Sequence, residues 1–124
     1  MNTLFWRGWP SRLLSIVMLG TAMASPAYSH HGWSSYDAEK TMVVTTVVRN
    51  VQWRNPHAEA TIDHQGKGWT VVLAPIARMQ SRGLTADMLA DGVSATLEGY
   101  PRRDGTPEIR LERITVSGKT IELR

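Results

Sequence analysis

Histidine is the residue type in this sequence best suited to metal or acid–base chemistry. The chain has four histidines, His30, His31, His57 and His64, and all of them lie in its first half or just past it. Imidazole nitrogen binds zinc, copper, iron and nickel, and there is no cysteine to supply a thiolate. A metal site in this protein would therefore use nitrogen and oxygen ligands. His64 stands beside Gln65-Gly66 at the end of an alternating segment, so we expect it at the surface.

The environment of His30 depends on processing of the segment before it. Arg7 and Arg12 are followed by an apolar run of twelve residues, Leu13 to Ala24, and then by small residues. This is the pattern of a secretory signal, and the run is shorter than the roughly 20 residues needed to span a bilayer. The sequence predicts a cleaved signal peptide over residues 1–29, a single domain over residues 30–124, and a periplasmic protein with no membrane anchor after cleavage.

Two cleavage positions fit the small residues, and both leave a copper-binding amino terminus. Cleavage after Ser29 puts a free α-amine and an imidazole on His30, and a third nitrogen from His57 would complete a histidine brace. Cleavage after Ala27 makes His30 the third residue, so that amine, backbone amides and imidazole can surround Cu(II) or Ni(II) in a square plane. We predict a site for copper, or for another divalent transition metal, at His30 and His57, with His31 as an auxiliary ligand.

The histidines also have a purely structural interpretation. A His pair at a terminus is commonly solvated, and His57 after Asn55-Pro56 can serve only to hydrogen-bond across a turn. Distance is a further difficulty, because His30 precedes and His57 follows a predicted strand that would span roughly 45 Å if it were straight. The alternative function is therefore a non-metal module that binds a protein or a small molecule.

Charge and motifs exclude several other classes of function. The chain has 14 basic and 11 acidic residues, and removal of Arg7 and Arg12 with the signal leaves a net charge of +1. No cluster of Lys and Arg remains to follow a phosphate backbone, so nucleic acid is not an expected partner. The sequence contains no nucleophile elbow, no glycine-rich phosphate loop and no persuasive carboxylate pair, so nothing in it points to catalysis. We expect a monomer that binds a metal ion, a small ligand or a periplasmic protein.

The elements that must position these residues are mostly strands. Val and Thr dominate residues 40–53, with apolar side chains on both faces, which predicts one long, bent strand that ends at Asn55-Pro56. Pro75 and Gly83 bracket a short helix, and Thr85 is placed as the N-cap of a second helical turn. Gln65 to Gly68 is expected as a hairpin loop. The further predicted strands cover residues 58–64, 69–73, 93–100, 108–116 and 120–123.

The order of these elements predicts the fold class. A long bent strand, two more strands, a helical insert and two further strands form the order of an OB-fold, a five-stranded Greek-key barrel. We therefore predict an all-β protein with a small helical insert, an OB-fold-like barrel of five to six strands. The aromatic residues Trp33, Tyr36, Trp53 and Trp69 could line a ligand cleft, although aromatic residues beside strands more often belong to the core. The acids Asp37, Glu39, Asp87 and Asp91 are expected on loops.

Several short motifs resemble those of a known family. They are His30-His31-Gly32-Trp33 after the signal, Tyr36-Asp37, Val51-Gln52-Trp53-Arg54-Asn55-Pro56-His57, Arg82-Gly83-Leu84-Thr85 and Glu98-Gly99-Tyr100-Pro101. They are similar to a family of small exported bacterial proteins catalogued as domain of unknown function 6152. The resemblance covers nearly all of the mature chain and implies export and a single domain, but no activity. Family members often carry an Ala-x-Ala pattern before the His pair, which favours cleavage directly before His30; here Ser29 holds the last small position.

Overall fold

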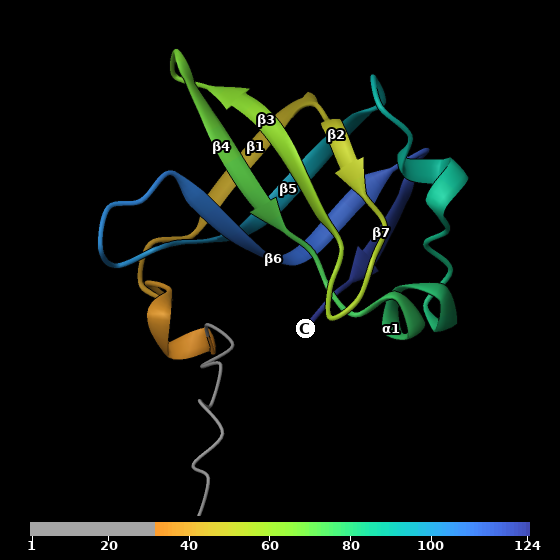
Figure 1. Ribbon diagram of the computed structural model, residues 1–124, viewed down its shortest axis with the longest axis horizontal. Coiled ribbons are helices and arrows are strands. Elements are labelled where there is room, and N and C mark those ends of the chain that lie inside the picture. Colours follow the sequence, from red (N-terminus) through yellow and green to blue (C-terminus); the bar gives the residue numbers. More distant parts are fainter. Residues whose placement is uncertain (1–31) are drawn as a thin grey trace, which may run out of the picture.

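The computed structural model describes residues 32–124, so the predicted signal segment, His30 and His31 lie outside the described residues. The described chain forms an all-β barrel with one short α-helix, which confirms the predicted fold class (Figure 1). All of its strands belong to one curled sheet. No helix within residues 32–124 is long and apolar enough to cross a membrane.

Seven strands replace the six that the sequence predicts, because the first strand is divided at Val48. The predicted loop over residues 65–68 is also too long: Gln65 and Gly66 alone form the turn, both with positive φ (51° and 73°), as two-residue hairpins require. The strands are β1 (Met42–Val47), β2 (Arg49–Gln52), β3 (Glu59–His64), β4 (Lys67–Val72), β5 (Ser94–Pro101), β6 (Glu108–Val116) and β7 (Lys119–Glu122).

Three short helices accompany the strands of the described chain. Helix α1 (Ile76–Ser81) lies between Pro75 and Gly83 as predicted, and the 3-10 helix η2 (Ala86–Leu89) follows it. Thr85 is the N-cap residue of η2, but its side chain makes no capping hydrogen bond. The 3-10 helix η1 (Trp33–Ser35) precedes the first strand and was not predicted.

The strand order is that of an OB-like barrel. The sheet runs β1-β5-β6-β4-β3-β2, with β7 also paired to β6. Because β1 and β2 are two parts of one bent segment, this order brings the sheet back to its own first strand. The β4–β6 pair is parallel and the other strand pairs are antiparallel. With α1 placed between β4 and β5, these pairings match the predicted topology.

The bend between β1 and β2 is held by the segment that leads into β5. Val48 is 1% exposed, and its backbone N–H donates to the carbonyl of Val93 at 2.9 Å. Asn50 follows with a φ of 48°, and the Asp91 carboxylate accepts hydrogen bonds from the N–H groups of Asn50 and Val51. Asp91 is therefore more than the loop acid that the sequence predicts, since it closes the bend.

Alternation along the strands decides which side chains enter the core. In β6, Ile109 and Leu111 point inward and are fully buried, whereas Glu108 and Arg110 lie on the outer face and are half-buried. Met79 of α1 is also fully buried and belongs to the same core, and α1 lies at one end of the barrel (Figure 1). Each such aliphatic side chain contributes about 1.5–3 kcal/mol of burial free energy, and no disulfide is needed.

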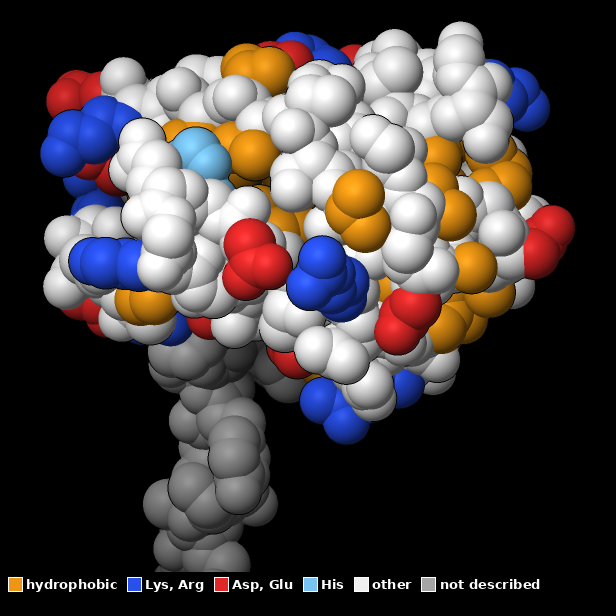
Figure 2. All heavy atoms as spheres, turned by 90° about the horizontal axis from the view of Figure 1, so that it is seen from above, with side chains coloured by type: hydrophobic (Ala, Val, Ile, Leu, Met, Phe, Trp, Pro, Cys, Tyr) orange, Lys and Arg blue, Asp and Glu red, His pale blue; other side chains and the backbone are white. Residues whose placement is uncertain are grey.

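The surface seen from the top of the barrel is mixed in charge. Figure 2 shows acidic and basic side chains interspersed around the rim of this face, with hydrophobic side chains in small groups between them. Val43 and Val47 are the exposed large hydrophobic residues of the described chain, at 62% and 38%. Both lie on the outer face of β1.

Candidate functional site

Trp33 fastens the start of the described chain to the outer face of the barrel. The guanidinium carbons of Arg110 and Arg124 lie 4.5 Å and 4.7 Å from the centre of its ring. Tyr100 meets the same ring edge-on, with centroids 6.1 Å apart. A guanidinium over an indole face is attracted by the ring quadrupole, by about 0.5–1 kcal/mol where water has access. These contacts join η1 to β5, to β6 and to the residues after β7.

Tyr36 fixes the same segment a few residues later. It pairs with Arg102 in an antiparallel bridge, is 2% exposed, and its hydroxyl donates to the Glu108 carboxylate at 2.5 Å. Burial, and then this hydrogen bond, raise the pKa of Tyr36 well above its usual range. The guanidinium carbon of Arg110 lies 5.8 Å from the Tyr36 ring, so this arginine contacts both aromatic side chains.

The aromatic residues therefore divide between two environments. Tyr36 is buried against Glu108 and Arg110 of the outer face. Trp53 and Trp69 are half-buried and pack against the core, as expected for aromatic residues beside strands. Trp33 instead lies among arginines on the outer face. No pocket lined by these side chains was found in the described part of the chain, and the proposed ligand cleft has no support there.

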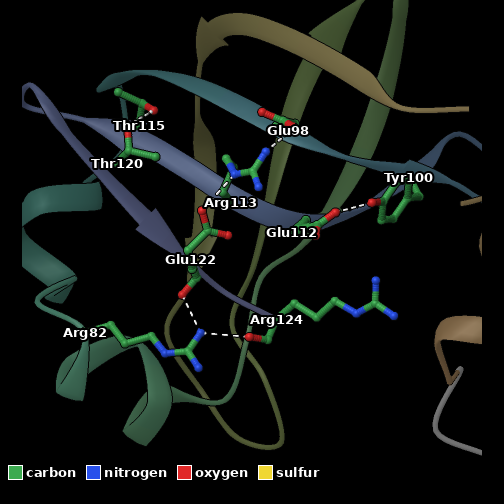
Figure 3. A network of polar contacts seen from close by, with 9 residues as sticks. All are labelled: Arg82, Glu98, Tyr100, Glu112, Arg113, Thr115, Thr120, Glu122 and Arg124. Carbon is green, nitrogen blue, oxygen red and sulfur yellow. Dashed lines mark hydrogen bonds and ion pairs between the residues drawn. The ribbon is translucent and has the colours of Figure 1, made fainter.

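The C-terminal residues that contact Trp33 are themselves held by a polar network (Figure 3). One Arg82 nitrogen donates to the carbonyl oxygen of Glu122 at 2.7 Å and to a backbone oxygen of Arg124 at 2.9 Å. Arg113 bridges the Glu98 and Glu122 carboxylates, and the Tyr100 hydroxyl donates to Glu112. The backbone beneath the Arg124 side chain is thus tied to the segment after α1.

His57 lies in the loop between β2 and β3, directly after the cis peptide bond of Asn55-Pro56. Its Nδ1 atom is buried and has no hydrogen-bond partner among residues 32–124. The nearest acidic atom is Oε1 of Glu59, 3.8 Å away. The side chain as a whole is 26% exposed, and Nε2, unlike Nδ1, is not among the buried nitrogens without a partner. His57 therefore offers Nε2 as the nitrogen with access to a ligand.

The His57 loop and the Trp33 contacts lie on one part of the outer face. Glu59 pairs with Val72, Val72 with Arg110, and Arg110 with Tyr100, so these four residues form one row across β3, β4, β6 and β5. Neighbouring strands are about 4.8 Å apart, which puts the backbones of Glu59 and Arg110 roughly 10 Å apart. The bend between β1 and β2 shortens the distance of about 45 Å that a straight first strand would span.

The predicted metal ligands are only partly within the described residues. Across residues 32–124, no three His, Asp or Glu side chains are close enough together to hold a metal ion. His57 is one of the predicted ligands, and His30 and His31 lie outside the described residues. His64 lies at the β3–β4 hairpin with its ring edge-on to Trp69, at a centroid distance of 5.7 Å.

Three residues of this region were not singled out from the sequence. Glu59 could have been, since it lies two positions after His57 in an alternating segment and so shares its face. Arg110 and Arg124 carry no local signal, because they meet Trp33 only through the sheet pairing.

The fold and this region define a small OB-like barrel protein in which the segment from Trp33 to Tyr36 packs on the outer face, and the loop before β3 carries a histidine. The model of a family of unknown function, DUF6152, matches residues 18–109, and the chain belongs to this family. The resemblance seen in the sequence motifs is thereby confirmed. No curated protein matches the chain.

Proposed function

We propose that this protein is a small exported binding protein of the periplasm that holds one Cu(II) ion on the outer face of its barrel. The α-amine and imidazole of His30 and Nε2 of His57 are the proposed ligands, and His31 is auxiliary. Three nitrogen donors suit Cu(II), and the amine is free only if the signal over residues 1–29 is removed after Ser29. Copper is thus the proposed cofactor, and no catalytic step is assigned.

The observation that carries this proposal is the environment of His57. One ring nitrogen is buried without a partner, and the accessible edge of the ring includes the other. An imidazole held in this way can bind a metal without first giving up a hydrogen bond within residues 32–124.

Chain reach supports the pairing of His57 with His30. His30 lies three positions before Trp33, and an extended chain covers about 3.6 Å per residue, or roughly 11 Å. Trp33 itself packs on Arg110, whose backbone is about 10 Å from that of Glu59 beside His57. These distances support the proposal that the amino terminus of the mature chain approaches the His57 loop.

The test is a competition titration of Cu(II) at fixed pH on the exported protein, after its intact mass has identified the first residue. His57→Ala should weaken binding at least about tenfold, because one of three ligands is lost. One residue added before His30 should weaken it similarly, since the amine moves away from the imidazole. His64→Ala is the matched control and should leave the affinity unchanged. Fixed pH matters because the ligands must be deprotonated to bind.

Two results would overturn the shared site. Equal affinities for wild type and His57→Ala, together with loss of binding in His30→Ala, would leave copper wrapped by the amino-terminal residues alone. Weak binding of Cu(II) by the wild type and by every variant would rule out copper as the ligand of this protein.

The second candidate function, a module that binds a protein or small molecule without a metal, is favoured by one observation. Val43 and Val47 are exposed on the outer face of β1, where they flank Thr45, whose hydroxyl contacts that of Thr96 at 2.9 Å. This is an uncharged strip of sheet surface of the kind that a partner can cover. Loss of partner binding in Val43→Lys, with copper affinity unchanged, would support this function.

A further inference from the structure

The short segment from His57 to Glu59 is rigidly held, and its two polar side chains share one face. Ala58 between them is fully buried. Its N–H donates to the carbonyl of Ala74 at 3.1 Å, and its carbonyl accepts from Leu73 at 2.9 Å. Alternation in an extended segment puts residues i and i+2 on the same side, so His57 and Glu59 both lie outward. Their relative position is therefore set by the backbone.

The Glu59 carboxylate is directed at the buried nitrogen of His57. Oε1 of Glu59 lies 3.8 Å from Nδ1, and the other carboxylate oxygen lies 3.8 Å from a guanidinium nitrogen of Arg54. A distance of 3.8 Å is too long for a hydrogen bond, but a movement of about 1 Å by the Glu59 side chain would make one. The Arg54 contact restrains the carboxylate from the side opposite His57.

A carboxylate at one ring nitrogen determines what the other nitrogen can do. A neutral imidazole carries one proton, and a hydrogen bond from Nδ1–H to a carboxylate keeps that proton on Nδ1. Nε2 then presents its lone pair outward. In metal sites such a carboxylate partner also fixes the ring orientation and makes the ligating nitrogen more basic.

From this geometry we infer that Glu59 is the positioning residue for His57, holding its proton on Nδ1 so that Nε2 faces the ligand. The inference rests on the proposed copper site and adds to it a residue outside the ligand set. Glu59 acts through His57, and the ion pair with Arg54 helps to keep the carboxylate in place.

The first measurement needs no metal. Two-bond proton–nitrogen NMR correlations of the exported protein, at a pH of about 8 where histidine is neutral, report which ring nitrogen carries the proton. The His57 signals are identified by their absence in His57→Ala. We expect His57 in the wild type to carry its proton on Nδ1, whereas a free imidazole in water prefers Nε2. Glu59→Gln should move the population toward Nε2–H.

The second measurement is Cu(II) affinity by competition titration, with the nitrogen hyperfine pattern of the bound ion as the spectroscopic signature. Glu59→Gln should weaken binding about 10- to 100-fold, the range found when such partners are removed, with the three-nitrogen pattern retained at saturation. Asp63→Asn is the matched control, since Asp63 lies on the same strand and pairs with Arg49 at 3.5 Å. It should change the affinity less than about twofold.

The outcomes separate the two proposals. Protonation of His57 on Nε2 in the wild type, or an affinity of Glu59→Gln equal to that of Asp63→Asn, would overturn the role of Glu59 while leaving copper binding intact. A change in the g and copper hyperfine values of Glu59→Gln that indicates loss of an oxygen ligand would also overturn it, since Glu59 would then bind the metal directly. If the protein binds no copper through His57 but the NMR result holds, the proposed function fails and the orienting contact stands.

Discussion

The carboxylate of Asp91 accepts a 2.8 Å hydrogen bond from the backbone N–H of Val51, forty positions earlier in the chain. Its second oxygen accepts from the N–H of Asn50 at 3.1 Å. One side chain thus satisfies two backbone donors at the point where the first strand turns and where Asn50 adopts a left-handed conformation. Within the described residues, neither N–H group is paired in the strand register, so the carboxylate supplies the two acceptors that a neighbouring strand would otherwise provide.

Replacing Asp91 should therefore destabilise the barrel more than its exposed position suggests. We expect Asp91→Ala to lower the free energy of unfolding by about 1–3 kcal/mol, since two charge-assisted hydrogen bonds are lost. The measurement is urea denaturation followed by circular dichroism. Asp63→Ala, which removes an exposed ion pair with Arg49, should cost no more than about 1 kcal/mol. Equal midpoints for the two variants would contradict the role assigned to Asp91.

Gly99 should tolerate no side chain at all. It lies at the irregularity in the β5–β6 ladder, where a Cβ atom would overlap the carbonyl of Arg110 and come within 2.8 Å of the Leu111 Cα. The obstacle is backbone, which cannot rotate away, so we expect Gly99→Ala to cost about 3 kcal/mol or more, or to prevent folding. Gly68→Ala is the control, because Gly68 is also in a strand and has open space around its Cβ position. A Gly99→Ala protein with the wild-type denaturation midpoint would show that the strands can separate at this point.

Alkaline titration should reveal the contacts of the tyrosines. In a chain that begins at His30, Tyr36 and Tyr100 are the two tyrosines present. The pKa of Tyr36 is raised by burial and by its bond to Glu108, and that of Tyr100 by its bond to Glu112 and by burial. An unfolded phenol ionises near pH 10, so this contribution to stability is complete below about pH 10 and is lost as the pH rises further.

We therefore expect tyrosinate absorbance to rise together with the loss of the circular dichroism signal, above about pH 10, rather than before it. Tyr36→Phe should make the free energy of unfolding less dependent on pH in this range. Ionisation of both phenols near pH 10 in a protein that is still folded would contradict the contacts described for them.

Local pattern was sufficient for most of the fold. The Val and Thr content of the first strand, the alternation of β3, and the Pro75 and Gly83 boundaries of α1 depend on neighbours in sequence, and each element was predicted to within a few residues. The OB-fold prediction came from the order of the elements, and no single residue indicated the parallel pairing of β4 with β6. A bend in the first strand was predicted, but its position at Val48 and its contact with Asp91 were not, because that contact spans forty residues.

The candidate site was less predictable for the same reason. His57 was identified from its residue type, and Glu59 could have been identified from alternation. The stacking of Trp33 on Arg110 and Arg124 joins residues 77 and 91 positions apart, and only the closed sheet brings them together. η1 was missed because a three-residue helix has too few residues to show a period.

The pairing of β1 with β5 also determines how much of the chain must be synthesised before the barrel can close. Residues 42–47 are made early, yet their partners are residues 94–99, and β5 in turn needs β6, which ends at Val116. The β3–β4 hairpin can form alone, but isolated hairpins are marginal in water. Until almost the whole chain is available, no closed sheet can assemble, and such long-range pairings typically fold in milliseconds to seconds. A growing chain therefore cannot close the barrel before β6 has been synthesised.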